Sequence, residues 1–351
     1  MSYLHGGDVY RTKNIEYDFS ININPLGMPV RSLEAAREAV LLSGRYPDYK
    51  GGQLCRAIAE AEKADESWIL LGNGAAELIY ILCHTLRPAQ GMITAPSFQE
   101  YEAAILSAGG SPVIWNLEEE DHFQIRDDCL SAITEGVDVF FLCNPNNPTG
   151  SLTERKLLEK IAAKCESTDT FFCLDECFLP FLENEENITM KHQVRKYPHL
   201  IILRAFTKIY GMPGLRLGYA LSANEELLSR MRMCLQPWNT SIPAQMAGIE
   251  ALKDRQYLEE SRQLIRREKD YLTGEMRKGL AEKIYDSSAN YLFFKSRSDL
   301  KELLLQHKIL IRGCGNFRGL TDEHFRIGIR THEENQELIR RWREIRWQNQ
   351  S

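Results

Sequence analysis

The sequence predicts an α/β protein: a large domain with a mainly parallel sheet flanked by helices, followed by a smaller α+β domain. Three observations support this prediction. Short apolar runs alternate with amphipathic stretches from Trp68 onward, which is typical of a parallel sheet covered by helices. Polar or glycine-rich turns follow several of these runs. After about residue 245, a long charged helix and alternating strands replace this pattern.

The N-terminal stretch is predicted to be an extended arm. Residues 1–30 are rich in Gly, Asn and Pro, which favour turns over helix. A first helix is expected at Ser32–Leu42, and a second helix follows the break RYPDYKGG. We therefore divide the chain into an arm with the first helix (1–40), a large domain (41–245) and a small domain (246–351).

Five apolar runs of the large domain are predicted to be strands: WILL, GMITAP, VDVFFLC, TFFCLDE and LIILRAF. The helices between them include SLTERKLLEKIAAKC, where Ser151 and Glu154 have the spacing of a capping box. In the small domain, NYLFFK, ILIR and FRIGIR are expected strands, and a closing helix begins near Glu333. Ligands of such parallel sheets bind beyond the carboxyl ends of the strands.

Composition excludes several classes of function. The net charge of −6 and the pI near 5.9 indicate no nucleic-acid partner. No segment reaches the roughly 20 apolar residues of a membrane span, and no signal peptide is recognisable. The nine cysteines fit a reducing cytoplasm. Cys173 and Cys177 have no histidine nearby, so no metal site is expected.

A lysine and an arginine define the predicted site. Lys208 follows the buried strand LIILRAF, and Arg216 lies in a Gly-flanked turn further on. A lysine at the mouth of a parallel sheet can lose its proton and attack an aldehyde. Arginine can hold a phosphate through its planar fork of donors. An aldehyde that carries a phosphate describes pyridoxal 5'-phosphate, whose ring accepts electrons.

Other strand ends offer the remaining contacts of such a cofactor. Asp175 ends the run TFFCLD and can meet a protonated pyridine nitrogen; the alternative is a helix cap or a surface-loop acid. Asn147, in the rigid turn NPNNPTG, can donate to a ring hydroxyl. The turn GNGAAE presents backbone N–H groups of Gly74 and Ala75 at a helix N-terminus. Phe98 can stack on the ring, or it is part of the core.

Together, GNG, NPNNPTG, DEC and FTK followed by GLRLGY resemble the motifs of the fold-type I pyridoxal-phosphate enzymes, the aspartate aminotransferase superfamily. The resemblance covers essentially the whole chain. It implies that Lys208 bonds covalently to the cofactor. It also implies that Asp175 pairs with the pyridine nitrogen and Asn147 with the ring hydroxyl.

The resemblance also assigns the phosphate and the ring face of the cofactor. Arg216 and the turn at Gly74 and Ala75 would hold the phosphate, and Phe98 would stack on the ring. Tyr46, in RYPD, resembles the tyrosine that reaches the phosphate in the neighbouring subunit. The resemblance therefore implies a homodimer with shared active sites.

Two positions depart from the family pattern. The family usually has Ser or Thr three residues before the lysine, where this chain has Ala205, and Thr207 is the expected substitute for phosphate binding. The family tyrosine after the aspartate motif is Phe178 here. A phenolic bond to the ring hydroxyl is therefore missing.

Two groups within the superfamily fit best: histidinol-phosphate aminotransferases and the threonine-phosphate decarboxylases of cobalamin biosynthesis. Both take small phosphorylated amino substrates, which need extra cationic groups. Arg312, Arg326 and Arg330 are the candidates in the small domain, and Arg326 resembles the family arginine that binds a carboxylate. The alternative is that these are exposed strand charges.

The arm and the C-terminal motifs favour the decarboxylase pattern. HGGD, DFSININPLG and ILIRGCGNFRGL resemble that group, and His5 and Asn24 would then close over the substrate; for His5 the alternative is a disordered end. We expect decarboxylation of L-threonine O-3-phosphate to (R)-1-aminopropan-2-yl phosphate and CO2. Histidinol-phosphate transamination and phosphoserine decarboxylation are the alternatives, because one methyl group discriminates weakly. A binding-only regulator is disfavoured because Lys208 is present and no helix-turn-helix is recognisable.

Overall fold

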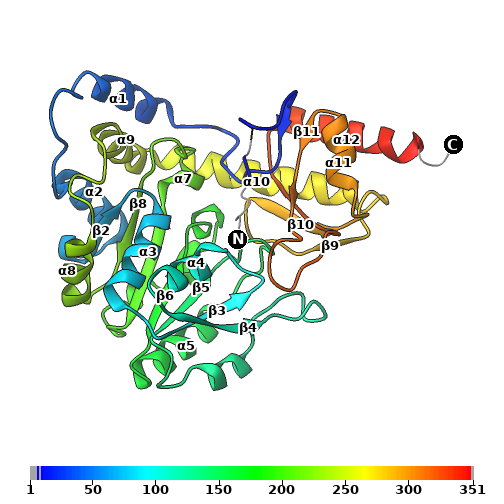
Figure 1. Ribbon diagram of the computed structural model, residues 1–351. Coiled ribbons are helices and arrows are strands. Elements are labelled where there is room, and N and C mark those ends of the chain that lie inside the picture. The colour runs from blue at the N-terminus through cyan, green and yellow to red at the C-terminus, as the bar shows by residue number, and fades with distance from the viewer. Residues whose placement is uncertain (1–5, 8, 349–351) are drawn as a thin grey trace.

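A computed structural model describes residues 6, 7 and 9–348 (Figure 1). Its centre is a seven-stranded sheet in the order β2-β8-β7-β6-β5-β3-β4. The strands are β2 (Ile69–Gly72), β3 (Gln90–Ala95), β4 (Ser111–Asn116), β5 (Val139–Cys143), β6 (Phe171–Asp175), β7 (Leu200–Ala205) and β8 (Gly218–Leu221). β8 pairs antiparallel with both neighbours, and the other pairs are parallel. The predicted mainly parallel sheet is confirmed.

Helices cover the central strands and explain their composition. β5 and β7 are buried along their whole length, so these strands are continuous apolar runs rather than alternating ones. The helices of this part are α1 (Val30–Val40), α2 (Gly52–Glu62), α3 (Ala75–Leu86), α4 (Glu100–Ser107), α5 (Arg155–Ser167), α6 (Glu185–Ile188), α7 (Phe206–Ile209), α8 (Glu225–Cys234) and α9 (Ile242–Lys253). Four short 3-10 helices are η1 (Glu66–Trp68), η2 (Asp127–Ala132), η3 (Leu179–Phe181) and η4 (Lys191–Gln193).

The predicted capping box at the start of α5 is wrong. The helix begins at Arg155, with Glu154 as N-cap and no side-chain cap hydrogen bond. The Ser151 hydroxyl instead donates to the carbonyl of Phe123 at 3.2 Å. Ser151 is therefore part of the NPNNPTG turn, whose tertiary contacts override the local capping pattern.

The C-terminal part has its own antiparallel sheet in the order β12-β13-β10-β9. Its strands are β9 (Lys283–Tyr285), β10 (Tyr291–Lys295), β12 (Arg312–Gly313) and β13 (His324–Gly328), and its helices are α10 (Arg255–Met276), α11 (Leu300–Gln306) and α12 (His332–Gln348). Figure 1 shows α10 running from the large sheet into this smaller part. The predicted smaller α+β unit is confirmed, whereas the exact division at residue 245 stays a prediction. α9 runs through that position and packs against α1 and α2.

The N-terminal arm joins the two sheets. The expected strand ILIR is divided, and its first half, β11 (Ile309–Leu310), pairs in parallel with β1 (Tyr17–Asp18) of the arm. Arg326 of β13 donates to the carbonyl of Ser20 at 3.0 Å. The arm then passes the end of β7, where the N–H of Asn24 donates to the carbonyl of Lys208 at 3.0 Å.

A carboxylate in the loop after β4 also connects the two parts. Glu119 accepts hydrogen bonds from Tyr285 at 2.5 Å and from Lys283 at 3.1 Å, and it pairs with Lys295 at 3.2 Å. Burial alone would raise the pKa of Glu119, but these donors lower it to about 2. This junction lies at one edge of the cleft between the sheets. No helix of the described residues is long and apolar enough to cross a membrane.

Candidate active site

A cavity of about 250 Å³ lies where the carboxyl ends of the parallel strands meet the arm and the small domain. Most of the residues predicted from the sequence line it: Ala75, Phe98, Asn147, Asp175, Thr207, Lys208, Arg216, Arg312 and Arg326. They come from segments spread over the whole chain, and most of those in the large domain lie at or just beyond a strand end or at the start of a helix. This position agrees with the rule that ligands bind beyond the carboxyl ends of parallel strands. We call it the Lys208 cavity.

Lys208 is held at the cavity by the short helix α7, which begins directly after β7. Its ammonium donates to the side-chain oxygen of Asn22 on the arm at 2.9 Å. Burial, together with the positive charge of Arg326, lowers the pKa of Lys208 to about 8. A substantial fraction of such an amine is unprotonated near neutral pH, as nucleophilic attack on an aldehyde requires.

Asp175 is the last residue of β6 and is buried. The hydroxyl of Tyr101 donates to one carboxylate oxygen at 2.6 Å, and the N–H of Cys177 donates to the other at 2.9 Å. Tyr101 is itself fixed by stacking on Phe141, with ring centroids 5.2 Å apart. These contacts orient the carboxylate and leave lone pairs for a cationic N–H in the cavity. Asp175 is therefore neither a helix cap nor a surface acid.

Arg216 and the start of α3 form an anion-binding corner. An added Cβ on Gly74 would lie 2.5 Å from Nη2 of Arg216, so glycine is required for this close approach. The guanidinium reaches carbonyl oxygens of Pro213 and Asn73 at 3.4 and 3.5 Å. The first-turn N–H groups of α3, beginning at Ala75, have no partner within the helix. Such a helix start beside a guanidinium suits a phosphate.

The small domain contributes two buried arginines. Arg326 on β13 donates to the side-chain oxygen of Asn147, and its buried Nε has no hydrogen-bond partner among the described residues. Arg312 on β12 donates to the side-chain oxygen of Asn316 at 2.9 Å. Asn316 in turn exchanges hydrogen bonds with Gln99, next to Phe98, at 2.7 and 3.0 Å. The arginines are not exposed strand charges.

The cavity has an excess of positive charge. Within the described part of the chain, four basic side chains line it, namely Lys208, Arg216, Arg312 and Arg326, against the single carboxylate of Asp175. Arginine and lysine side chains form strong charge-assisted hydrogen bonds to carboxylate and phosphate groups. A ligand set with several negative groups would therefore be stabilised here.

Four described residues that were predicted for the site do not line this cavity: Gly74, Asn24, Arg330 and Tyr46. The amide of Asn24 donates to the carbonyl of Ile209 and to the hydroxyl of Ser261, both at 2.7 Å. Arg330 pairs with Glu334 at 2.9 Å. This geometry gives no support to the substrate-binding roles of Asn24 and Arg330, which stay predictions. His5 lies outside the described residues.

Tyr46 also lies away from the cavity of its own chain. It is 75% exposed and stacks on Trp238 with centroids 4.4 Å apart. The surrounding surface has further exposed apolar side chains, including Leu41 and Tyr49. Tyr46 therefore has no role in the Lys208 cavity of its own chain. Its exposed position is compatible with a role in the active site of a neighbouring subunit.

Several residues of the site were missed in the sequence. Asn22, Ser20 and Phe317 line the cavity, and Tyr101 supports Asp175. Asn22 stands two residues before the predicted Asn24 in the same motif. The motif therefore indicated the correct segment of the arm, but Asn22 rather than Asn24 lines the cavity. No local pattern marks Tyr101, because its contact joins α4 to β6.

The two departures from the family pattern also lie at the cavity. Ala205 and Thr207 both line it, and phosphate binding by the Thr207 hydroxyl stays a prediction. Phe178 packs edge-on against Tyr291, with centroids 5.3 Å apart, and its ring lies 6.0 Å from the ammonium of Lys208. The phenylalanine thus keeps the packing position and lacks only the hydroxyl.

Comparison with known proteins agrees with this geometry. The sequence profile of the aminotransferase class I and II family matches residues 15–341. The chain belongs to this family. The resemblance seen in the motifs is therefore confirmed.

Individual relatives of this aminotransferase-family protein are named as decarboxylases, as cobalamin-biosynthesis proteins or as aminotransferases. The threonine-phosphate decarboxylase of Salmonella typhimurium is 36% identical, covering 97% of this chain and 96% of that protein. The adenosylcobalamin biosynthesis bifunctional protein of Leptospira interrogans is 31% identical over 92% of this chain, which spans 38% of that protein. The solved structure of the histidinol-phosphate aminotransferase from Clostridium acetobutylicum superposes with a TM-score of 0.89 and 31% identity, covering 95% of this chain and 99% of that one.

The residues of the cavity fit pyridoxal phosphate. Lys208 offers an amine for the aldehyde, and Asp175 offers an oriented carboxylate for the pyridine N–H. The close approach of Arg216 to Gly74 forms the corner for the phosphate, and Phe98 lines the cavity between them. The donor set is therefore the one that this cofactor requires.

Proposed function

We propose that this protein is a pyridoxal-phosphate-dependent decarboxylase that converts L-threonine O-3-phosphate into (R)-1-aminopropan-2-yl phosphate and CO2. The observation that carries the proposal is the charge of the Lys208 cavity, with four basic side chains and one carboxylate. A cofactor phosphate, a substrate carboxylate and a substrate phosphate match this surplus. The full-length similarity to a threonine-phosphate decarboxylase supports this substrate, and the bifunctional relative supports a place in cobalamin biosynthesis.

The cofactor side of the cavity has three tasks. When bound, pyridoxal phosphate supplies an aldehyde for the amine of Lys208 and a ring that accepts the electrons released at the substrate Cα. Asp175 keeps the proton on the pyridine nitrogen, because its carboxylate is buried and held by two donors. Arg216 and the start of α3 hold the phosphate, and Asn147 is the partner of the ring hydroxyl.

The substrate side must choose which bond to Cα breaks. Arg326 is the candidate for the substrate carboxylate, because it lies between Asn147 and the arm. Arg312, the first residue of β12, is the candidate for the substrate phosphate. In decarboxylation the bond from Cα to the carboxylate breaks, CO2 leaves, and Lys208 supplies a proton to Cα. Water is excluded by the arm, whose Ser20 and Asn22 line the cavity.

A homodimer completes the proposal. Tyr46 would reach the cofactor phosphate of the partner subunit, and the exposed apolar surface around it would be covered in the dimer. Eight of the nine cysteines are buried as free thiols, which suits the reducing cytoplasm.

Transamination of histidinol phosphate is the competing function, supported by the similar solved structure. One experiment separates the two: the holoenzyme is incubated with threonine phosphate without any 2-oxo acid, and CO2 is measured. We expect many turnovers. A single turnover that continues only with 2-oxoglutarate would favour the aminotransferase, and no reaction would favour a binding protein. Phosphoserine should react within about 10- to 200-fold of threonine phosphate, because the two differ by one methyl group.

A further inference from the structure

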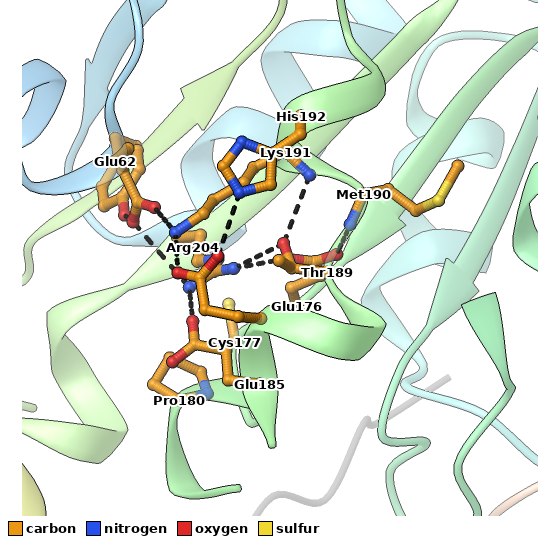
Figure 2. A network of polar contacts seen from close by, with 12 residues as sticks. Glu62, Glu176, Cys177, Pro180, Glu185, Thr189, Met190, Lys191, His192 and Arg204 are labelled. Atoms are coloured by element: carbon orange, nitrogen blue, oxygen red, sulfur yellow. Dashed lines mark hydrogen bonds and ion pairs between the residues drawn. The ribbon is translucent and has the colours of Figure 1, made fainter. Parts of the chain in front are cut away.

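Two consecutive residues at the end of β6 point to opposite faces of the sheet. Asp175 faces the Lys208 cavity, whereas Glu176 faces a buried polar network on the other side (Figure 2). This alternation is the ordinary geometry of a strand. Among the described residues, the charged members of the network are Glu62, Glu176, Glu185, Glu186, Lys191, Arg204 and Arg262. We call it the Glu176–Arg204 network.

The central contact of this network joins β6 to β7. Nη2 of Arg204 donates to Glu176 at 2.6 Å, and the two side chains are 5% and 0% exposed. Thr189 donates to Glu176 at 2.7 Å and accepts from Arg204 at 2.9 Å. The N–H of Met190 also donates to Glu176, at 2.9 Å. Both charged groups are therefore held from several directions.

The contact lies directly behind the residues of the site. Glu176 follows Asp175, and Arg204 is the penultimate residue of β7, whose end leads into the helix that carries Lys208. The N–H of Glu176 also donates to the carbonyl of Leu203 at 2.9 Å. Beyond the parallel ladder that ends with Asp175 beside Leu203, the ends of β6 and β7 are thus joined by one further backbone hydrogen bond and one buried ion pair.

Each charged group of the network has an opposite charge within reach, with four acids and three bases among its described members. Paired buried charges contribute little net stability, but a directional ion pair can specify one arrangement of the chain. An apolar pair of similar size would bury this space without specifying the relative position of the two strand ends. The ion pair instead restricts how β6 and β7 lie relative to each other.

We propose that Glu176 and Arg204 are positioning residues that hold the Asp175 carboxylate and the Lys208 amine at the separation that the cofactor requires. The purpose of this positioning, to bind the cofactor, rests on the proposed function. The geometric claim, that the ion pair fixes the relative position of the ends of β6 and β7, concerns only this chain. Loosening the ion pair lets the end of β7 move, and the amine of Lys208 becomes better solvated.

The test measures the pKa of Lys208 in the full-length protein without cofactor. Competitive labelling with acetic anhydride over a pH series, followed by mass spectrometry of the Lys208 peptide, gives this value. Glu176→Gln removes a negative charge, so its direct electrostatic effect would lower the pKa of an amine. Positioning predicts the opposite: a rise of about half a pH unit or more, about threefold in the ionisation constant.

Two further variants make the result decisive. Thr189→Val removes a hydrogen bond from Glu176 and another from Arg204 without changing the charge. It should therefore raise the pKa of Lys208 as well. If Glu176→Gln does not fold, Thr189→Val can replace it as the test. Glu186→Gln is the matched control, because it removes a carboxylate of the same network that binds Lys191 at 2.6 Å and His192 at 3.0 Å rather than Arg204. Its Lys208 pKa should not rise.

An unchanged or lowered pKa in Glu176→Gln and Thr189→Val would overturn the proposal. An equal rise in Glu186→Gln would overturn it too, because the effect would then be a general loosening of the network. The labelling needs neither cofactor nor substrate. A wild-type protein that releases no CO2 from threonine phosphate would therefore refute the proposed function and leave the positioning result standing.

Discussion

The ammonium of Lys208 donates to the side-chain oxygen of Asn22 at 2.9 Å, across 186 positions of the sequence. This contact ties the predicted nucleophile to the N-terminal arm. Because a neutral oxygen accepts from the charged amine, Asn22 favours the protonated form, against burial and the charge of Arg326. The arm therefore takes part in setting the protonation of Lys208.

Substitutions at Asn22 should shift the pKa of Lys208 in opposite directions. Asn22→Asp adds a negative charge and should raise this pKa by about one unit, whereas Asn22→Ala removes the acceptor and should lower it. The pH dependence of the rate at which the protein captures pyridoxal phosphate measures both shifts. Shifts of the same sign in the two variants would contradict the role given to Asn22.

Replacing Lys208 should stabilise the protein without cofactor. Its pKa is lowered to about 8 from the usual 10.5, so the folded state binds this proton more weakly than the unfolded state does. The resulting cost is complete below pH 8, declines as pH rises and is absent above the unfolded value. Lys208→Met should therefore raise the free energy of unfolding by about 2 kcal/mol at pH 7, after allowance for the partial exposure of the side chain.

Urea denaturation at pH 7 and pH 10 checks this expectation. The advantage of Lys208→Met should be clearly smaller at pH 10 than at pH 7. A variant that is less stable than wild type at both pH values would show that the charged amine is not a source of strain. Arg297→Met, at a surface pair with Asp299, serves as a control with little pH dependence in this range.

The two arginines of β13 and its following turn should differ sharply in their effect on activity. Arg326→Gln should lower kcat/KM for threonine phosphate at least about 100-fold, or about 2.7 kcal/mol, because a buried guanidinium facing the substrate is lost. Arg330→Gln should stay within about threefold of wild type, since Arg330 binds Glu334 outside the cavity. Steady-state kinetics of the two variants measure the contrast. Equal losses would restore Arg330 to the substrate site.

Mixed dimers test whether active sites are shared. Lys208→Ala and Tyr46→Ala should each be nearly inactive alone, because each removes one side of every site. After the two variants are mixed and allowed to exchange subunits, half the dimers are hybrids, and one site in each hybrid is intact. Activity should recover to about a quarter of the wild-type value. No recovery, despite hybrids detected by mass spectrometry, would place Tyr46 outside the partner's site.

The strand ends of the large domain were predictable because the local signals agree with the global fold. Asp175 and Lys208 each follow an apolar run that can only be a buried strand, so the position of their side chains follows from the parallel sheet. The antiparallel strand β8 was missed because it has only four residues and its first two, Gly218 and Tyr219, belong to the motif GLRLGY. No sequence feature of that stretch predicts a strand that runs antiparallel to its neighbours.

Contacts between distant segments were harder to predict. Asn22 and Asn24 are both polar residues of one irregular stretch, and no periodicity decides which faces the cavity. The structure turns Asn24 toward Ser261 of α10 and leaves Asn22 for Lys208. Likewise, Arg330 differs from Arg326 only in that Glu334 follows it one helical turn later. Tertiary packing decides these cases.

The pairing of β1 with β11 has a consequence for biogenesis. Tyr17 lies beside Ile309, so during translation the arm must wait for a segment that emerges much later. Contacts of such long sequence separation form late, because the intervening loop must first be closed. The pocket around Lys208 can therefore be completed only after residue 309 has emerged. A nascent chain stalled before residue 309 would carry the strands of the large sheet with β1 unpaired.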